Sequence, residues 1–139
     1  MSQENVEIVK RAFEAQNRGD LDGLLDLMTE DVVIDASRRI IDPVKATGHE
    51  EVMSLAAMLD DVWADQRREA EDWIDAGDAV VVPMRLINRG RASGVPVEAR
   101  SAWAVYVCEG KITRLVVYQS RAEALEAVGL SEQDAHADS

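Results

Sequence analysis

Asp35 and Arg100 are the residues of this sequence that could carry a polar chemical step. Asp35 ends the apolar stretch "DVVID", and carboxylates are common general acids and bases. Arg100 follows Glu98 by two positions in a predicted strand, so both residues lie on one face of it. A guanidinium there could hold a carboxylate or polarise a carbonyl. The alternative is an ion pair with Glu98 or with another acidic neighbour.

The sequence predicts neither a nucleophile nor a metal site. Cys108, the only cysteine, precedes a turn and has no paired His and Asp arrangement. No group of Cys and His has the spacing of metal ligands, which excludes a structural zinc. His49 stands at the start of a predicted helix in "GHEEV", where we expect it to serve the turn.

The overall charge is strongly acidic. The 139 residues include 15 Lys+Arg and 27 Asp+Glu, which gives a net charge of −12. Such a field repels phosphate backbones and anionic lipids, so we expect no nucleic-acid partner and no membrane attachment. The start, "MSQENVEIVK", has no apolar signal segment, and no apolar run is long enough to span a bilayer. The sequence therefore predicts a soluble cytoplasmic protein.

The first half of the chain has the periodicity of three amphipathic helices. Ser2 is the expected cap of the first helix and Asp20 that of the second. A capping box of Thr47 and Glu50 opens the third helix, which runs to Trp63. The expected apolar faces carry Val6, Val9, Phe13, Leu21, Leu24, Leu25, Met28, Val52, Leu55, Leu59 and Val62. Between the second and third helices, "DVVID" predicts a short strand.

The second half of the chain changes to the alternation of β-strands. Strands are predicted at 67–75, 79–88, 97–108 and 112–119, and the short turns between them favour antiparallel neighbours. Ser120 and Glu123 form a capping box for a final helix that closes at Gly129. We therefore predict one α+β domain over residues 1–130, followed by a polar, disordered tail over 131–139.

Both faces of the predicted strand 97–108 are apolar. One face carries Trp103, Val105 and Val107, and the opposite face carries Ala102 and Ala104. Because the helices are expected to cover only one side of the sheet, the face with Trp103, Val105 and Val107 should remain uncovered. A symmetric homodimer that packs through this face is the simplest way to bury it.

Four segments of the sequence together form a family pattern. They are "AFEAQNRGDLDGLLDLMTEDVVID", "GHEEV", "WIDAGDAVVV" and "EGKITRLVVYQSRAEALEAVGL", in this order. The pattern resembles the SnoaL-like branch of the nuclear transport factor 2 (NTF2-like) superfamily over nearly all of residues 3–130. The resemblance implies a cone-shaped fold, in which a strongly curved antiparallel sheet wraps around three N-terminal helices and leaves an internal pocket. It also implies no cofactor, because the superfamily's isomerases, cyclases, dehydratases and epoxide hydrolases use acid/base chemistry alone.

The positions that do chemistry in the related enzymes are apolar here. The resemblance to ketosteroid isomerases places their oxyanion tyrosine at Ala12, their general-base aspartate at Ala36 and their protonated aspartic acid near Ala102. The acid/base aspartate of the polyketide cyclases falls near Val117. Alanine offers no hydrogen bond to a developing charge, so isomerase chemistry by that mechanism is not expected. These positions are instead expected to line a ligand pocket.

Four polar or aromatic residues remain as candidates, each with two interpretations. Asp35 could act as the base if the strand end shifts by one residue relative to the isomerases, or it could bond its own loop. Arg100 could anchor a ligand, or it could pair with an acid at the pocket mouth. Gln119 could reach into the cavity or end an exposed strand. Trp63 could cover a ligand or only pack.

Two classes of function follow from these positions. The first is a binding or accessory protein that takes a small hydrophobic molecule without chemistry. The alternative is a cofactor-independent acid/base enzyme of the cyclase, isomerase, dehydratase or hydrolase type that uses Asp35 or Arg100. A buried Asp35 that faces the cavity with a raised pKa would favour the enzyme, and a loop-bonded Asp35 would favour binding.

Overall fold

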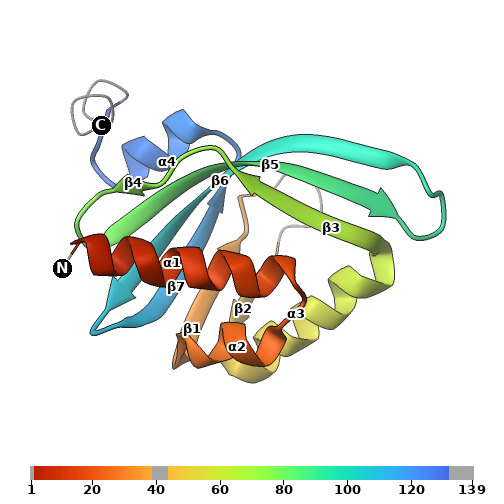
Figure 1. The fold of residues 1–139 in the computed structure, drawn as a ribbon, viewed down its shortest axis with the longest axis horizontal. Coiled ribbons are helices and arrows are strands. Elements are labelled where there is room, and N and C mark those ends of the chain that lie inside the picture. Colours follow the sequence, from red (N-terminus) through yellow and green to blue (C-terminus); the bar gives the residue numbers. More distant parts are fainter. Residues whose placement is uncertain (1, 39–43, 132–139) are drawn as a thin grey trace.

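The computed structural model describes residues 2–38 and 44–131, which form four helices and seven strands. The helices are α1 (Ser2–Asn17), α2 (Leu21–Asp26), α3 (Gly48–Val62) and α4 (Arg121–Ala127). The strands are β1 (Met28–Ala36), β2 (Val44–Thr47), β3 (Trp63–Ala70), β4 (Ile74–Asp75), β5 (Ala79–Gly90), β6 (Pro96–Cys108) and β7 (Lys111–Tyr118) (Figure 1). Apart from Ser131, the predicted tail lies outside the described residues. No helix in the described part of the chain is long and apolar enough to cross a membrane.

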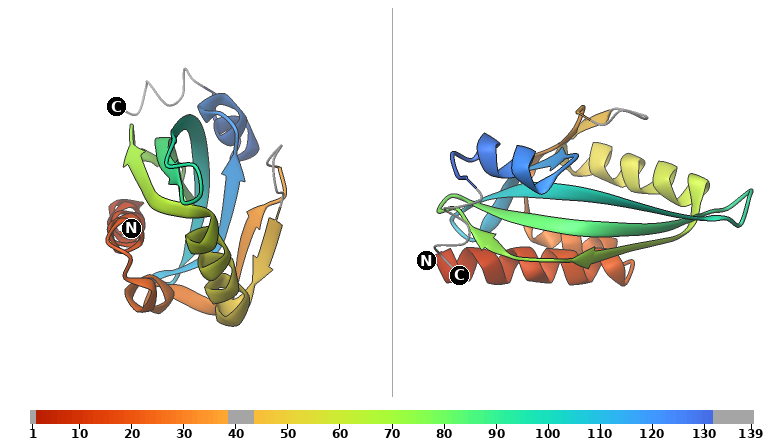
Figure 2. Two further views of the ribbon diagram at one scale, coloured as in Figure 1. Left: turned by 90° about the vertical axis from the view of Figure 1, so that its right-hand side faces the viewer. Right: turned by 90° about the horizontal axis from the view of Figure 1, so that it is seen from above.

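The strands build one curled, unclosed sheet. Its order is β2-β1-β7-β6-β5-β3, and β4 pairs with β5. Among the described residues, neighbouring strands are antiparallel, except that β1 and β7 run parallel. The sheet curls around α3, which contacts β1, β2 and β3, while α4 lies on the outer side (Figure 2). The predicted α+β class, with a curved sheet around N-terminal helices, is confirmed.

Two strand predictions need correction. The expected strand over 67–75 is divided into β3, which begins at Trp63, and the short β4. β2 was not predicted, and it pairs in antiparallel register with the end of β1. Neither feature has a local signal in the sequence, because β2 is only four residues long and β3 follows α3 without a turn residue between them.

The predicted caps of α2 and α4 are confirmed. The Asp20 carboxylate accepts a hydrogen bond from the Gly23 N–H at 2.9 Å, which satisfies one of the free donors at the start of α2. The Ser120 hydroxyl accepts one from the Glu123 N–H at 3.2 Å. At the end of α4, Gly129 has a φ of 81°, a conformation that glycine adopts without a steric cost.

The predicted capping box of α3 is wrong. The Thr47 side chain makes no capping hydrogen bond. The carboxylate that accepts the Thr47 N–H, at 2.8 Å, belongs to Glu51 rather than to Glu50. The capping-box pattern places the acid three residues after the cap, whereas the acid that accepts the Thr47 N–H here lies four residues after it.

The predicted dimer face is buried inside the single chain. The Phe13 ring of α1 lies edge-on to the Trp103 ring, with centroids 5.7 Å apart and planes at 64°. Trp103, Val105 and Val107 all belong to the main core cluster, and each is at most 7% exposed. This face therefore cannot be the surface of a homodimer. The homodimer itself stays a prediction that needs another surface, and sedimentation equilibrium would test it.

The other face of β6 is covered by α4. Ala102 and Ala104 lie in a second apolar cluster with Val116 and with Leu125 of α4. Helices were expected on one face of the sheet only, and this expectation is wrong because α4 packs across its outer side (Figure 2). Both apolar faces at this part of β6 are thus covered within one chain.

Candidate ligand-binding site

A cavity of about 420 Å³ lies between α3 and the concave face of the sheet. Its volume is in the range of ordinary small-molecule sites. Most of its wall is apolar and comes from α2, α3, β1 and β7. Prominent members of this apolar wall are Ile34, Val52, Leu55, Leu59, Leu115 and Val117.

The wall formed by β3 and β5 carries three polar side chains beside Trp63 and Leu86. Gln66 and Arg68 alternate along β3 and line the cavity together. Asn88 of β5 also lines it and is the direct cross-strand partner of Gln66. Gln16 reaches the same cavity from α1. None of these residues was a candidate from the sequence. Arg68 and Asn88 lay within predicted strands, but Gln66 lay before the strand expected at 67–75, so the alternation of Gln66 and Arg68 was not recognised.

Four residues predicted to line the pocket do contribute to the cavity wall: Ala36, Trp63, Val117 and Gln119. Trp63 begins β3 and is half-buried at the cavity wall. The Gln119 side chain donates a hydrogen bond from Nε2 to the Arg38 carbonyl at 2.8 Å, so it fastens the loop after β1 to the end of β7. Gln119 borders the cavity and is also exposed at the end of β7, so both of its expected placements apply.

Ala12 and Ala102 lie elsewhere. Ala12 is packed in the main core cluster, and Ala102 lies under α4 in the second cluster. On β6 the cavity wall includes Ser101 and Trp103, which flank Ala102. The expectation that Ala102 faces the pocket is therefore wrong by one position, and a shift of one residue moves a strand side chain to the opposite face.

Asp35 is bonded to its own loop. One oxygen of its carboxylate accepts the Ser37 N–H at 3.0 Å and the Ser37 hydroxyl at 2.5 Å. These two hydrogen bonds lower the pKa of Asp35; burial opposes them, and the positive charges of Lys45 and Arg114 add to the lowering. Asp35 is not among the described residues that line the cavity, although its neighbours Ile34 and Ala36 are.

Arg100 borders the cavity, but its charged end is paired outside it. The guanidinium Nη1 lies 2.7 Å and 2.6 Å from the two carboxylate oxygens of Glu71. The Arg100 side chain is 69% exposed. Glu98, the acid considered as a partner from the sequence, instead pairs with Arg85 at 3.3 Å. Arg100 thus forms an ion pair, as one of its two interpretations expected, and its partner is Glu71 rather than Glu98.

Tyr118 is the one phenol among the described cavity residues. It is 6% exposed, and the Arg38 guanidinium lies 5.2 Å from its ring centroid. Burial, with a smaller contribution from Tyr106, raises the pKa of Tyr118. The hydroxyl group of Tyr118 is therefore protonated at neutral pH and is available only as a hydrogen-bonding group.

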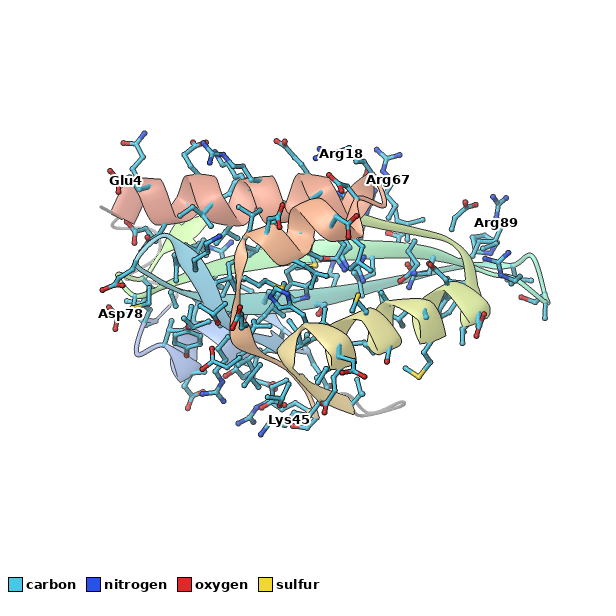
Figure 3. All side chains as sticks on the ribbon, turned by 90° about the horizontal axis from the view of Figure 1, so that it is seen from below. Glu4, Arg18, Lys45, Arg67, Asp78 and Arg89 are labelled. Carbon is cyan, nitrogen blue, oxygen red and sulfur yellow. The ribbon has the colours of Figure 1, made fainter. Side chains whose placement is uncertain are left out.

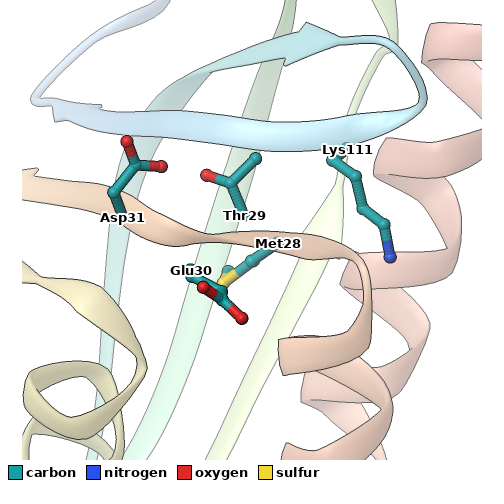
Figure 4. Close-up of a pocket in the computed structure, with 5 residues that line it drawn as sticks. All are labelled: Met28, Thr29, Glu30, Asp31 and Lys111. Atoms are coloured by element: carbon teal, nitrogen blue, oxygen red, sulfur yellow. The ribbon is translucent and has the colours of Figure 1, made fainter.

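A second hollow lies beside β1 and is lined by Met28, Thr29, Glu30, Asp31 and Lys111. It is larger, at about 700 Å³, but it is open to solvent. Thr29 and Asp31 point to one side of β1 and Glu30 to the other, so the two carboxylates do not converge (Figure 4). Lys111 donates to the Asp26 carbonyl instead of to either carboxylate. We therefore take the mainly apolar cavity beside α3, which is the less open of the two, as the candidate site.

Comparison with protein families gives a match to the SnoaL-like domain over residues 9–115. The chain belongs to this family. No curated protein sequence matches this SnoaL-like chain. Among solved structures it is similar to TerC co-crystallised with polyporic acid, at 20% identity and a TM-score of 0.76, over 90% of this chain and 98% of that one.

Two further solved structures resemble this SnoaL-like chain. One is an NTF2-like protein of unknown function from Burkholderia pseudomallei, with 20% identity, a TM-score of 0.75, and coverage of 91% of this chain and 98% of that one. The other is RV0760c from Mycobacterium tuberculosis in complex with estradiol-17β-hemisuccinate, with 19% identity, a TM-score of 0.72, and coverage of 85% and 95%. At these identities the similarities show the NTF2-like fold.

Proposed function

We propose that this SnoaL-like domain binds a small, largely apolar organic molecule in its 420 Å³ cavity and performs no chemistry on it. One observation carries the proposal. Among the described residues that line the cavity, none is Asp, Glu, His, Lys or Cys. General acid/base catalysis relies mainly on these residue types. The Ser101 hydroxyl at the wall donates to the Tyr118 carbonyl at 3.0 Å, and no described residue of these types lines the cavity to activate it as a nucleophile. The wall is therefore better suited to burial of a ligand than to proton transfer.

The state of Asp35 supports binding over catalysis. A general base works best when its pKa lies near the operating pH, and the bonds from Ser37 move the pKa of Asp35 in the opposite direction. To reach the cavity, the carboxylate would also have to give up both hydrogen bonds to Ser37. Arg100 would similarly have to leave Glu71. The acid/base alternative thus requires rearrangement of both candidate residues.

The ligands of similar proteins support the same proposal. TerC was co-crystallised with polyporic acid, and RV0760c was solved with estradiol-17β-hemisuccinate. Both are small organic molecules held by proteins of this fold. For this chain, binding should depend mainly on the shape of the ligand and on its buried apolar area, at roughly 25 cal/mol per Å².

A cavity-blocking variant tests the proposal. Leu55→Trp places a large ring in the cavity wall on α3, whereas Met58→Trp, also on α3, alters a side chain that is 44% exposed. Both variants and the natural protein are screened by thermal shift against neutral aromatic and steroid-sized molecules. We expect stabilisation of the natural protein and of Met58→Trp, and its loss in Leu55→Trp. Equal stabilisation of all three proteins would show that binding occurs outside the cavity.

Product analysis separates binding from catalysis. Each ligand found by the screen is incubated with stoichiometric protein and recovered for chromatography and mass spectrometry. We expect every ligand to be recovered with unchanged retention and mass. An isomerised, cyclised, dehydrated or hydrolysed product that the Asp35→Asn variant no longer forms would establish the enzyme alternative instead.

A further inference from the structure

Two side-chain amides lie side by side on the sheet wall of the cavity. Gln66 of β3 and Asn88 of β5 are direct partners across the two antiparallel strands, and both line the cavity. Direct cross-strand partners point to the same face of a sheet, with Cβ atoms about 4.5–5.5 Å apart. Gln66 and Asn88, here called the amide pair, therefore form one polar patch within reach of a bound ligand.

The hydrogen-bonding groups of the amide pair are not used by the described part of the chain. The backbones of both residues belong to the ladder between β3 and β5, but neither side chain forms a hydrogen bond with another described residue. By contrast, Asn5, Asn17 and Gln119 each donate from the side chain to a backbone carbonyl, at 3.3, 2.9 and 2.8 Å. Those three amides hold segments of the fold together, whereas the amide pair keeps its donors and acceptors for the cavity.

A ligand that fills the cavity must replace the water around the amide pair. Both residues are half-buried, so solvent still reaches them. The wall that α3 contributes is apolar, and its lining residues include Leu55, Ala56 and Leu59. An amide that loses its water without gaining a new partner weakens binding, because its hydrogen bonds are not replaced. The cavity therefore favours a ligand that places a hydrogen-bonding group at the amide pair and an apolar body against α3.

We propose that the amide pair binds a neutral carboxamide-type group, either a carboxamide or a lactam, of a ligand with a compact apolar body. The inference rests on the proposed binding function and names the ligand class. Each amide of the pair offers one carbonyl acceptor and two N–H donors, and a ligand carboxamide presents the complementary set. An ionised group fits less well: a carboxylate only accepts, an ammonium only donates, and either loses more hydration on entry.

A matched pair of neutral ligands tests the role of the amide pair. 2-Naphthamide and 2-acetylnaphthalene have nearly the same shape, but the ketone has a methyl group in place of the N–H donors. A cavity that reads only apolar area should prefer the ketone, which loses less hydration on entry. By calorimetry at neutral pH, we expect the natural protein to prefer the naphthamide about fivefold. Gln66→Met and Asn88→Leu keep the size of each side chain and should each abolish this preference while both ligands still bind.

Arg67 supplies the matched control variant. It follows Gln66 on β3, it pairs with Glu69 at 3.3 Å, and its side chain is 71% exposed at the outside of the molecule (Figure 3). Arg67→Met introduces the same side chain as Gln66→Met on the opposite face of the same strand, and it should leave the preference unchanged. Equal losses in Arg67→Met and in the two amide variants would mean that the preference depends on β3 as a whole, and would overturn the inference.

The remaining outcomes also decide the question. Equal affinity for both ligands, a preference for the ketone, or a preference that survives both amide variants overturns the role of the amide pair and leaves the proposed function intact. Tighter binding of 2-naphthoate than of the naphthamide overturns the neutral ligand class. Binding of none of the three molecules contradicts the proposed function, and the inference falls with it. If an amide variant does not fold, the side-chain N–H₂ signals of Gln66 and Asn88 are followed by NMR in the natural protein. Shifts of both signals with naphthamide are the expected result, and no shift overturns the inference.

Discussion

The carboxylate of Asp35 is bonded to Ser37, two residues further along the chain. The Ser37 N–H and hydroxyl donate to the same carboxylate oxygen at 3.0 Å and 2.5 Å. Such a local turn fixes the direction of the chain as it leaves β1, next to the cavity residue Ala36. Asp35 thus holds the loop after β1 through Ser37, and the loss of this contact should lower the stability of the protein.

Asp35→Asn should reduce the stability of the protein at neutral pH, by about 1–2 kcal/mol, because hydrogen bonds to a charged acceptor are stronger. The folded-state pKa of Asp35 is lowered, so its contribution is present above the unfolded-state pKa and is lost as the pH falls through the folded-state value. Urea denaturation at several pH values should therefore show a difference between the two proteins that shrinks below about pH 4.

Ser37→Ala is the matched test of the same contact. It removes the hydroxyl donor and leaves the carboxylate and the backbone N–H in place. We expect a smaller loss of stability than in Asp35→Asn, with the same decrease at low pH. A stability difference for Asp35→Asn that is constant from neutral to acidic pH would contradict the assigned role of the charge.

Phe13 should be among the most sensitive positions of the core. Its ring meets both Trp73, at a centroid distance of 5.3 Å, and Trp103, at 5.7 Å. Phe13→Ala leaves a cavity between α1 and the sheet, and we expect a loss of about 3–5 kcal/mol in the free energy of unfolding. Val97→Ala, at a side chain that is 48% exposed, is the control and should change stability by less than about 0.5 kcal/mol. Similar losses in both variants would contradict the assigned packing.

Two of the three predicted side-chain caps at helices α2, α3 and α4 are present, whereas the placement of elements that are distant in the sequence was not predicted. The caps at Asp20 and Ser120 depend on side chains within three residues of each other, so the sequence pattern was sufficient. The placement of α4 depends on contacts with β5, β6 and β7 that are distant in the sequence. For this reason the sequence showed correctly that both faces of β6 are apolar, but not which part of the chain covers each face.

The candidate site shows the same limit. Alternation along the last strand was the basis for placing Gln119 at the cavity, and the resemblance to the polyketide cyclases was the basis for Val117. The contact of Arg100 with Glu71 joins residues 29 positions apart and has no local signal. Arg68 lay within the predicted strand 67–75, but Gln66 lay before it, so the alternation of Gln66 and Arg68 along β3 was not recognised. A search for alternating polar residues from Trp63 onward could have found it.

The acidic surface should prevent nucleic-acid binding. Counterion release from a phosphate backbone requires clustered cations, and the chain has a net charge of −12. We expect no change in the fluorescence anisotropy of labelled DNA or RNA at physiological salt with protein at tens of micromolar, roughly the strength of weak specific association. Binding that weakens as salt is added would contradict this prediction and would indicate a local basic surface.

The ion pair of Arg100 and Glu71 should contribute little to stability. The two side chains are 69% and 39% exposed, and water screens charges in such positions. A double-mutant cycle with Arg100→Gln and Glu71→Gln should give a coupling energy of about 0.2–1 kcal/mol from urea denaturation. Because the pair lies outside the cavity, Arg100→Gln should also leave the affinity for a ligand found by the thermal-shift screen within about twofold of the natural protein. A larger loss of that affinity would return Arg100 to the role of ligand anchor, with Glu71 as the residue that releases it.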